Sequence, residues 1–203
     1  MMYNVNVMIF FKGWFYSMKT SYKMKIAGLE RELSLFAINE DLYIGAFIMF
    51  GDVEITKACA AELLKLAPEY DIMVTAECKS IPLIYEMARQ SGADNYIIAR
   101  KAPKLYMRNV ISTGVDSITT KNSQTLCLGD VDAAAIKGKR VLLVDDVIST
   151  GESLAALEKL VSAAGGNIVG KMAVLAEGDA QKRDDIIFLE PLPLFDKEGN
   201  PIK

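Results

Sequence analysis

The chain has 203 residues, of which 51% are hydrophobic and 24% are charged, and its formal net charge is −3. This composition predicts a compact globular protein with a sizeable core and excludes a disordered chain. The slightly acidic balance argues against broad nucleic-acid binding, so we expect no nucleic-acid partner, although a local basic patch is compatible with it.

Two residue types narrow the chemistry further. The sequence contains no histidine, which excludes a Ser-His-Asp triad and a histidine metal site. Catalysis would have to use carboxylates, lysine, arginine, hydroxyls, the backbone or a borrowed metal ion. The three cysteines are scattered and lack metal-binding spacing, which favours a reducing, cytoplasmic location.

The N-terminal segment 1–17 is rich in aromatic residues and methionine and shows no helical or strand periodicity. Its apolar run 5–11 is closed by Lys12 and is too short to span a bilayer, and its flanks do not match a signal peptide. We therefore expect no membrane association. We interpret 1–17 as an N-terminal extension that is not native if translation starts at Met18, and 18–203 as the folded domain.

From residue 18 onward, strand and helix patterns alternate. Continuous apolar runs predict strands, and apolar residues three and four positions apart predict helices that end at proline or glycine. The predicted strands are 42–50, 71–76, 95–99, 110–113, 125–128, 141–144 and 168–176, and the predicted helices are 53–67, 80–90 and 152–164. This alternation predicts an α/β fold with a parallel sheet flanked by helices on both faces. Ligands of such sheets bind beyond the carboxyl ends of the strands.

The most informative segment is 140–153, with the sequence RVLLVDDVISTGES. An apolar strand ends at two adjacent carboxylates, Asp145 and Asp146, and the turn 149–151 then opens a helix. Free backbone N–H groups and hydroxyls at such a turn can bind a phosphate monoester, and Gly151 lets the backbone approach the anion closely. The carboxylates can accept hydrogen bonds from vicinal sugar hydroxyls. A phosphate site beside a diol site describes a ribose 5-phosphate.

Two other interpretations of this segment are weaker. A plain strand-to-helix turn with exposed acids is common, but adjacent acids ending a buried strand carry a desolvation cost that such a turn avoids. A nucleotide-binding fingerprint is excluded, because the chain has neither G-x-G-x-x-G nor G-x-x-x-x-G-K-[ST] here.

The segment 140–153 resembles, without a gap, the phosphoribosyl-pyrophosphate (PRPP) motif of the type I phosphoribosyltransferases. The resemblance continues more patchily over 18–195. It implies a parallel sheet with a small hood over the base, which we expect both chain ends to build through 26–33 and 189–195. It implies transfer of ribose 5-phosphate from PRPP to a ring nitrogen of a purine base, with release of pyrophosphate. Mg²⁺ as a cofactor carried mainly by PRPP, rather than by a protein metal site, and a homodimer are also implied.

The resemblance assigns roles to three groups of residues. Asp145 and Asp146 would orient the ribose and, with Asp116 of the loop 112–123, form the catalytic set. The residues that would hold the 5-phosphate are Val147, Ile148, Ser149, Thr150, Gly151, Glu152 and Ser153. Those that would hold the pyrophosphate are Glu77, Cys78, Lys79, Arg100, Lys101 and Lys104. Taken alone, the pyrophosphate segments could equally be a capped turn and a solvated basic turn.

The base and the activity stay open at this point. The stretch 100–105 (Arg-Lys-x-x-Lys-Leu) is most similar to the adenine phosphoribosyltransferases, so adenine is the first choice. The loop 112–123 departs from those enzymes, because its only acid is Asp116 where they carry a glutamate. The alternative is a non-catalytic, PRPP-binding regulatory domain. Such regulators carry a DNA-binding winged helix, for which we see no counterpart before Ala27.

Overall fold

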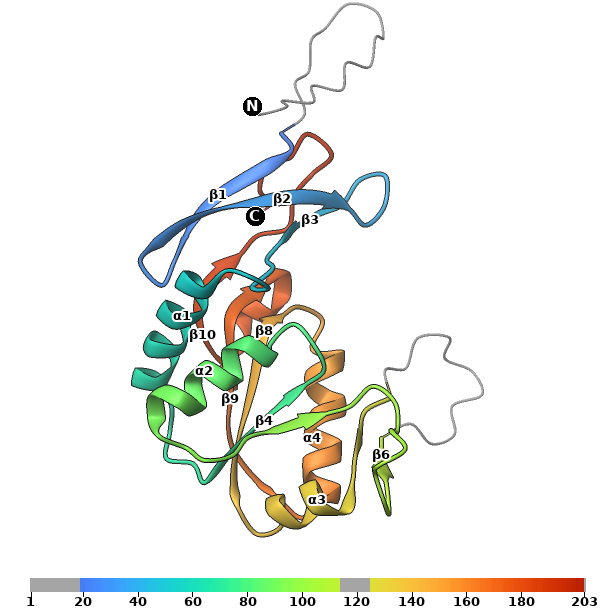
Figure 1. Ribbon diagram of the computed structural model, residues 1–203. Coiled ribbons are helices and arrows are strands. Elements are labelled where there is room, and N and C mark those ends of the chain that lie inside the picture. The colour runs from blue at the N-terminus through green and yellow to red at the C-terminus, as the bar shows by residue number, and fades with distance from the viewer. Residues whose placement is uncertain (1–18, 114–124, 203) are drawn as a thin grey trace, which may run out of the picture.

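The computed structural model describes residues 19–113 and 125–202 (Figure 1). Five strands form a parallel sheet in the order β10-β9-β8-β4-β5. These strands are β4 (Ile72–Ala76), β5 (Ile97–Ala99), β8 (Arg140–Ile148), β9 (Asn167–Glu177) and β10 (Ile187–Leu192). The predicted α/β fold with a parallel sheet flanked by helices is confirmed.

Helices cover both faces of this sheet (Figure 1). They are α1 (Val53–Leu66), α2 (Ile81–Ser91), α3 (Asp130–Ile136) and α4 (Glu152–Ala163). Alternate side chains of the central strand β8 enter two separate cores, as the period of two residues in a strand requires. Leu142 and Val144 pack in the core that includes α1 and α2, whereas Val141 and Leu143 pack in the core that includes α4. The middle strand is therefore buried on both faces along 141–144, which explains the fully apolar run at these positions.

The helix ends follow from local sequence. Asp52 caps α1 by accepting a hydrogen bond from the Ile55 N–H at 3.0 Å, and Pro68 stops the helix. Gly92 ends α2 in the left-handed conformation, with φ of 74°. Ser80 stands at the start of α2 as expected, but its hydroxyl makes no capping bond. This part of the prediction was wrong, because the hydroxyl is used in the site described below.

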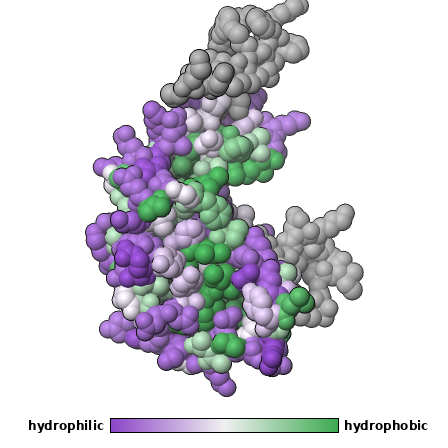
Figure 2. Space-filling model, in the orientation of Figure 1, coloured by the Kyte–Doolittle hydropathy of each residue, from purple (hydrophilic) through white to green (hydrophobic). Residues whose placement is uncertain are grey.

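A second sheet, which we call the hood, lies above the parallel sheet (Figure 1). It consists of the antiparallel strands β1 (Ser21–Ile26), β2 (Leu29–Ala37) and β3 (Tyr43–Ala46). The predicted strand 42–50 is thus shorter than expected and belongs to the hood. Figure 2 shows an indentation between the hood and the body of the molecule, with hydrophobic residues gathered along it.

The C-terminal contribution to the hood is smaller than predicted. Most of the segment 189–195 lies in β10, which pairs in parallel with β9 at the edge of the central sheet. The reason is packing, since Leu192 is fully buried in the core beneath α1. Glu190 therefore lies on an edge strand. Within this segment, Phe195 pairs with the hood through backbone bonds of 2.8 and 2.9 Å with Tyr43.

A short antiparallel pair, β6 (Ile111–Ser112) and β7 (Cys127–Leu128), flanks the loop expected at 112–123. Most of that loop, including Asp116, lies outside the described residues, as does the N-terminal extension 1–17. No helix in the part of the chain that the structure describes is long and apolar enough to cross a membrane.

Candidate active site

The two acids of the central strand lie within β8 and not beyond its end. The strand continues to Ile148 because β9 keeps pairing with it as far as the Ile148–Ala176 pair. The expectation that the strand stops before Asp145 was therefore wrong by four residues. Asp146 is only 3% exposed, so at least one of the two carboxyl groups is enclosed by protein. Such a group is expensive to leave without partners.

Asp145 is held by neighbours on both sides. It accepts hydrogen bonds from the Ser80 hydroxyl at 3.1 Å and from the backbone N–H of Asp146 at 2.9 Å. The Ser80 hydroxyl is also 2.7 Å from the Thr75 hydroxyl. Burial raises the pKa of Asp145 above its ordinary value, and the negative charge of Asp146 adds to the effect. A positive or hydrogen-bond-donating ligand would relieve this cost.

Asp146 is paired with the turn that follows β4. Its Oδ2 lies 2.9 Å from Lys79 Nζ. The contact is an ion pair without hydrogen-bond alignment, and among the described residues this oxygen has no hydrogen-bond partner. A buried carboxylate oxygen left in this way is available to accept from a sugar hydroxyl. The pair also brings a predicted pyrophosphate residue next to a predicted ribose residue.

The turn after β8 forms a small hollow. Gly151 precedes α4 in the left-handed conformation, with φ of 79°, and the first-turn N–H groups of that helix follow it. The hollow has a volume of about 110 Å³. It is lined by Asp145 and by every residue from Val147 to Leu154, and so by all seven residues predicted to hold the 5-phosphate. The helix dipole and the free N–H groups favour an anion here.

The basic stretch after β5 is tied to the turn after β4. Glu77 accepts a hydrogen bond from the Lys101 N–H at 3.1 Å and lies 3.4 Å from Arg100 Nη2. The bond from the Lys101 N–H, with the charge of Arg100, lowers the pKa of Glu77. Glu77 therefore organises the two predicted pyrophosphate segments. Cys78, Lys101 and Lys79 are exposed, so they can meet a ligand.

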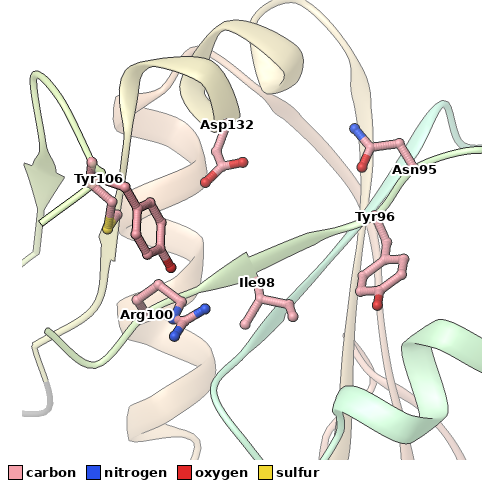
Figure 3. A pocket seen from close by; sticks show the side chains of 7 residues that line it. Asn95, Tyr96, Ile98, Arg100, Tyr106 and Asp132 are labelled. Carbon is pink, nitrogen blue, oxygen red and sulfur yellow. The ribbon is translucent and has the colours of Figure 1, made fainter. Parts of the chain in front are cut away.

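Arg100 also lines a second and larger cavity, of about 400 Å³, at the outer edge of β5 (Figure 3). Tyr106 and Asp132 face Arg100 across it, and burial raises the pKa of Asp132. This cavity shares no lining residue with the hollow beside Asp145. We place the site at the smaller hollow because the acids, the helix N-terminus and Lys79 converge there, whereas none of the residues predicted to hold the 5-phosphate lines the larger cavity.

Sequence reasoning missed two residues near the hollow. The Ser80 hydroxyl was expected to cap a helix, and nothing local indicated that it would bond Asp145 instead. Arg183, which follows the 3-10 helix η1 (Gly178–Lys182), lies against Gly151 although no motif pointed to it. A Cβ placed on Gly151 would lie 2.6 Å from Arg183 Nη1. The left-handed backbone favours glycine here, and a side chain at 151 would also have to displace the end of Arg183.

Comparison with known proteins agrees with the geometry. A family model described as the phosphoribosyl transferase domain matches residues 54–194. The adenine phosphoribosyltransferase of Rhodococcus jostii is 29% identical over 127 residues, covering 63% of this chain and 69% of the relative. The hypoxanthine/guanine phosphoribosyltransferase of Methanothermococcus okinawensis is 29% identical over 130 residues, covering 64% of this chain and 67% of the relative.

Solved structures show the same fold. The adenine phosphoribosyltransferase of Thermoanaerobacter pseudethanolicus matches with a TM-score of 0.57 and 22% identity, over 70% of this chain and 84% of that one. The enzyme of Saccharomyces cerevisiae matches with a TM-score of 0.57 and 18% identity, over 84% and 92%. Since the family model covers more than half of the sequence and the fold agrees, the chain belongs to the phosphoribosyltransferase family, with the fold of its type I members.

Proposed function

We propose that the protein transfers ribose 5-phosphate from PRPP to adenine and releases pyrophosphate, as a purine-salvage enzyme. One observation carries this proposal. The hollow that suits a phosphate is lined by Asp145 and by residues 147–154, and Asp146 beside it is paired with Lys79. A phosphate subsite, two carboxyl groups for a diol and a cation for a second anion thus lie in one place.

The chemistry follows from these positions. A ring nitrogen of the base forms a bond to ribose C1 while the bond from C1 to the pyrophosphate oxygen breaks, and pyrophosphate keeps the electron pair. The loop 149–153 would fix the 5-phosphate, and Asp145 and Asp146 would orient the ribose hydroxyls. Lys79, with Arg100, Lys101 and Lys104 of the basic stretch that Glu77 ties to the same turn, would stabilise the charge on the departing pyrophosphate. We propose Asp116 as the acceptor of the proton from the base.

The residues fit a metal ion that enters with the substrate. Within the described ranges, no three side chains of the kinds that bind metals form a cluster. The carboxyl groups of Asp145 and Asp146 would instead accept hydrogen bonds from the hydroxyls of a PRPP–Mg²⁺ complex. When bound, Mg²⁺ supplies charge neutralisation at the pyrophosphate.

The base is the finer part of the proposal. The basic stretch 100–105 supports adenine, while relatives named for adenine and for hypoxanthine and guanine match about equally well. The test is to incubate the protein with PRPP, Mg²⁺ and adenine, hypoxanthine, guanine or xanthine in parallel. We expect nucleotide and pyrophosphate from adenine only. Product from hypoxanthine or guanine alone would overturn the choice of base but leave the transferase intact.

A second function has one observation in its favour. The loop 112–123 carries Asp116 as its only acid, where the adenine enzymes carry a glutamate. A non-catalytic domain that binds PRPP as an effector would bind PRPP but yield no nucleotide from any base. Salt-sensitive binding to nonspecific DNA at low ionic strength would further favour this regulator. We propose transfer as the primary function because the similar relatives described above are named as phosphoribosyltransferases.

We also propose that the protein works as a homodimer, as its similarity to this family suggests. Sedimentation velocity at micromolar protein concentration tests this. A species of twice the chain mass is expected, and a species of single chain mass at every concentration would contradict it.

A further inference from the structure

Arg183 lies against Gly151 of the loop 149–153, which is predicted to bind the phosphate. It stands on an element outside the sequence motif 140–153. It follows η1 and reaches back to Gly151, where Nη1 occupies the space that a side chain at 151 would need. Arg183 does not line the hollow itself. A positive charge thus lies against Gly151, which lines the hollow predicted to hold the 5-phosphate.

The guanidinium is fixed in this position by its neighbours. Nε and Nη2 donate to the two carboxylate oxygens of Asp185, each at 2.8 Å. Lys171 pairs with the same carboxylate and with Glu158 on α4. The chain of ion pairs therefore runs from α4 through β9 to Arg183. It leaves Nη1 as the nitrogen turned toward Gly151.

Bidentate pairing is the geometry that best restricts the motion of an arginine side chain. Because both oxygens of Asp185 are engaged by Nε and Nη2, the arginine cannot swing into solvent without breaking two charged bonds. A held cation loses less conformational freedom when an anion binds nearby than a mobile one does. The side chain of Arg183 is 32% exposed, so its field is partly screened by solvent.

We infer that Arg183 is a further binding determinant of the site, a fixed cation that strengthens binding of the 5-phosphate through the loop that contacts it. This rests on the proposed function and deepens it at the phosphate subsite. A phosphate monoester carries a charge of about −1.5 to −2 near pH 7. A cation that contacts the loop therefore adds to the attraction that the helix dipole exerts on the phosphate. The pyrophosphate residues lie on other elements, so Arg183 should affect one anion of PRPP and not the other.

The competing role is purely structural, in which Arg183 only braces the loop. The two roles differ in salt dependence. Loss of a charge lowers both the affinity and its sensitivity to salt, whereas a loosened loop lowers the affinity equally at low and high salt. The two roles also differ in whether Arg183→Lys recovers the affinity, because lysine restores the charge but cannot make the two-pronged contact with Asp185.

The experiment titrates wild type, Arg183→Met and Arg183→Lys with ribose 5-phosphate and, separately, with pyrophosphate and Mg²⁺, at 50 and 300 mM salt. Arg140→Met is the matched control. Arg140 also donates to one aspartate through Nε and Nη2, both to Asp71 Oδ1, but it lies at the opposite end of β8. We expect Arg183→Met to weaken ribose 5-phosphate binding about tenfold at low salt and less at high salt. Pyrophosphate binding should stay within about twofold, and Arg183→Lys should recover most of the loss.

Three results would overturn the inference. Unchanged ribose 5-phosphate affinity in Arg183→Met, with wild type binding normally, removes the role of Arg183 and leaves the proposed function standing. An equal loss at both salt concentrations that lysine does not rescue shows bracing alone. If wild type binds neither pyrophosphate nor ribose 5-phosphate, the proposed function fails and the role of Arg183 fails with it. Thermal unfolding of Arg183→Met, compared with Arg183→Lys, checks that both variants are folded.

Discussion

Lys79 Nζ lies 2.9 Å from Asp146 Oδ2, and this ion pair joins the turn after β4 to the acidic end of β8. The partners differ in exposure, since the side chain of Asp146 is 4% exposed and that of Lys79 is 49% exposed. Removing the lysine leaves a buried carboxylate without a countercharge. Removing the carboxylate charge leaves a lysine that can turn into water. The two substitutions should therefore have unequal effects on the fold.

Lys79→Met should lower the free energy of unfolding by about 1–2 kcal/mol, because the buried charge of Asp146 loses its partner. Asp146→Asn should change it by less than about 0.5 kcal/mol while weakening PRPP binding, because the neutral amide does not need the lysine. Urea unfolding and PRPP titration of both variants measure this. A larger loss of stability in Asp146→Asn than in Lys79→Met would contradict the assignment of the buried partner, and unchanged PRPP affinity would remove Asp146 from the ribose site.

Asp145→Asn should stabilise the protein in a pH-dependent way. Burial beside Asp146 raises the pKa of Asp145 in the folded state, so ionisation of this group opposes folding. Below the unfolded-state pKa of about 3.9, both versions carry a neutral group and should unfold at similar temperatures. As the pH rises, only wild type acquires the buried charge, and the variant should unfold about 2–4 °C higher at pH 8.

The comparison between variant and wild type isolates this residue from carboxyl groups with the opposite shift, such as Glu86, whose pKa is lowered to about 2 by Arg89. Melting temperatures from pH 4 to 8 provide the test. If the difference in melting temperature between variant and wild type narrows with rising pH, the charged form of Asp145 stabilises the fold and does not oppose it. The same variant should lose PRPP affinity, which would separate stability from binding.

Gly151→Val should abolish ribose 5-phosphate binding. The substitution places a branched side chain at a φ of 79° and at the position of Arg183 Nη1. Gly151→Ala is the milder test, with a backbone cost of about 1 kcal/mol and a forced displacement of the guanidinium. Gly138, which also has positive φ but meets nothing within 4 Å, is the control, and Gly138→Ala should leave binding intact. Wild-type affinity in Gly151→Val would refute the phosphate-loop assignment.

Arg31 joins the hood to the parallel-sheet body. Its loss should weaken binding of the base more than binding of the phosphate. Its guanidinium donates to Asp52 at 2.7 and 3.0 Å and to Glu54 at 2.8 Å. Arg31→Met should lower stability by about 1 kcal/mol and raise the KM for the base, with ribose 5-phosphate affinity unchanged. Lys65→Met, which removes an exposed pair with Glu62 within α1, should do neither. Equal effects of both variants would mean that Arg31 does not position the hood.

Features that depend on neighbours in sequence were predictable. Pro68 and Gly92 mark helix ends because the conformational constraint is in the residue itself. The segment 140–153 contains the groups predicted to bind the phosphate and the diol within one strand–turn–helix unit. The strand order was not predicted, because it depends on contacts between distant segments. Sequence also predicted the hood, but it assigned 189–195 to it because a run of leucines and prolines does not reveal its partner strand.

Features that depend on distant contacts were not predictable. Ser80 has the sequence of a helix cap, yet its hydroxyl bonds Asp145, a choice that is made only when β4 and β8 lie side by side. The contact of Arg183 with Gly151 has no local signal, because it requires the turn after β9 to fold back over the start of α4.

The most direct test of the central proposal is a single-turnover experiment with the protein in excess over PRPP, in the presence of Mg²⁺ and adenine, with both products followed in the same quenched samples. The account predicts that AMP and pyrophosphate appear together, at equal amounts and equal rates, and that Asp146→Asn slows both. PRPP that stays intact while bound, or pyrophosphate released without AMP, would contradict the transfer reaction.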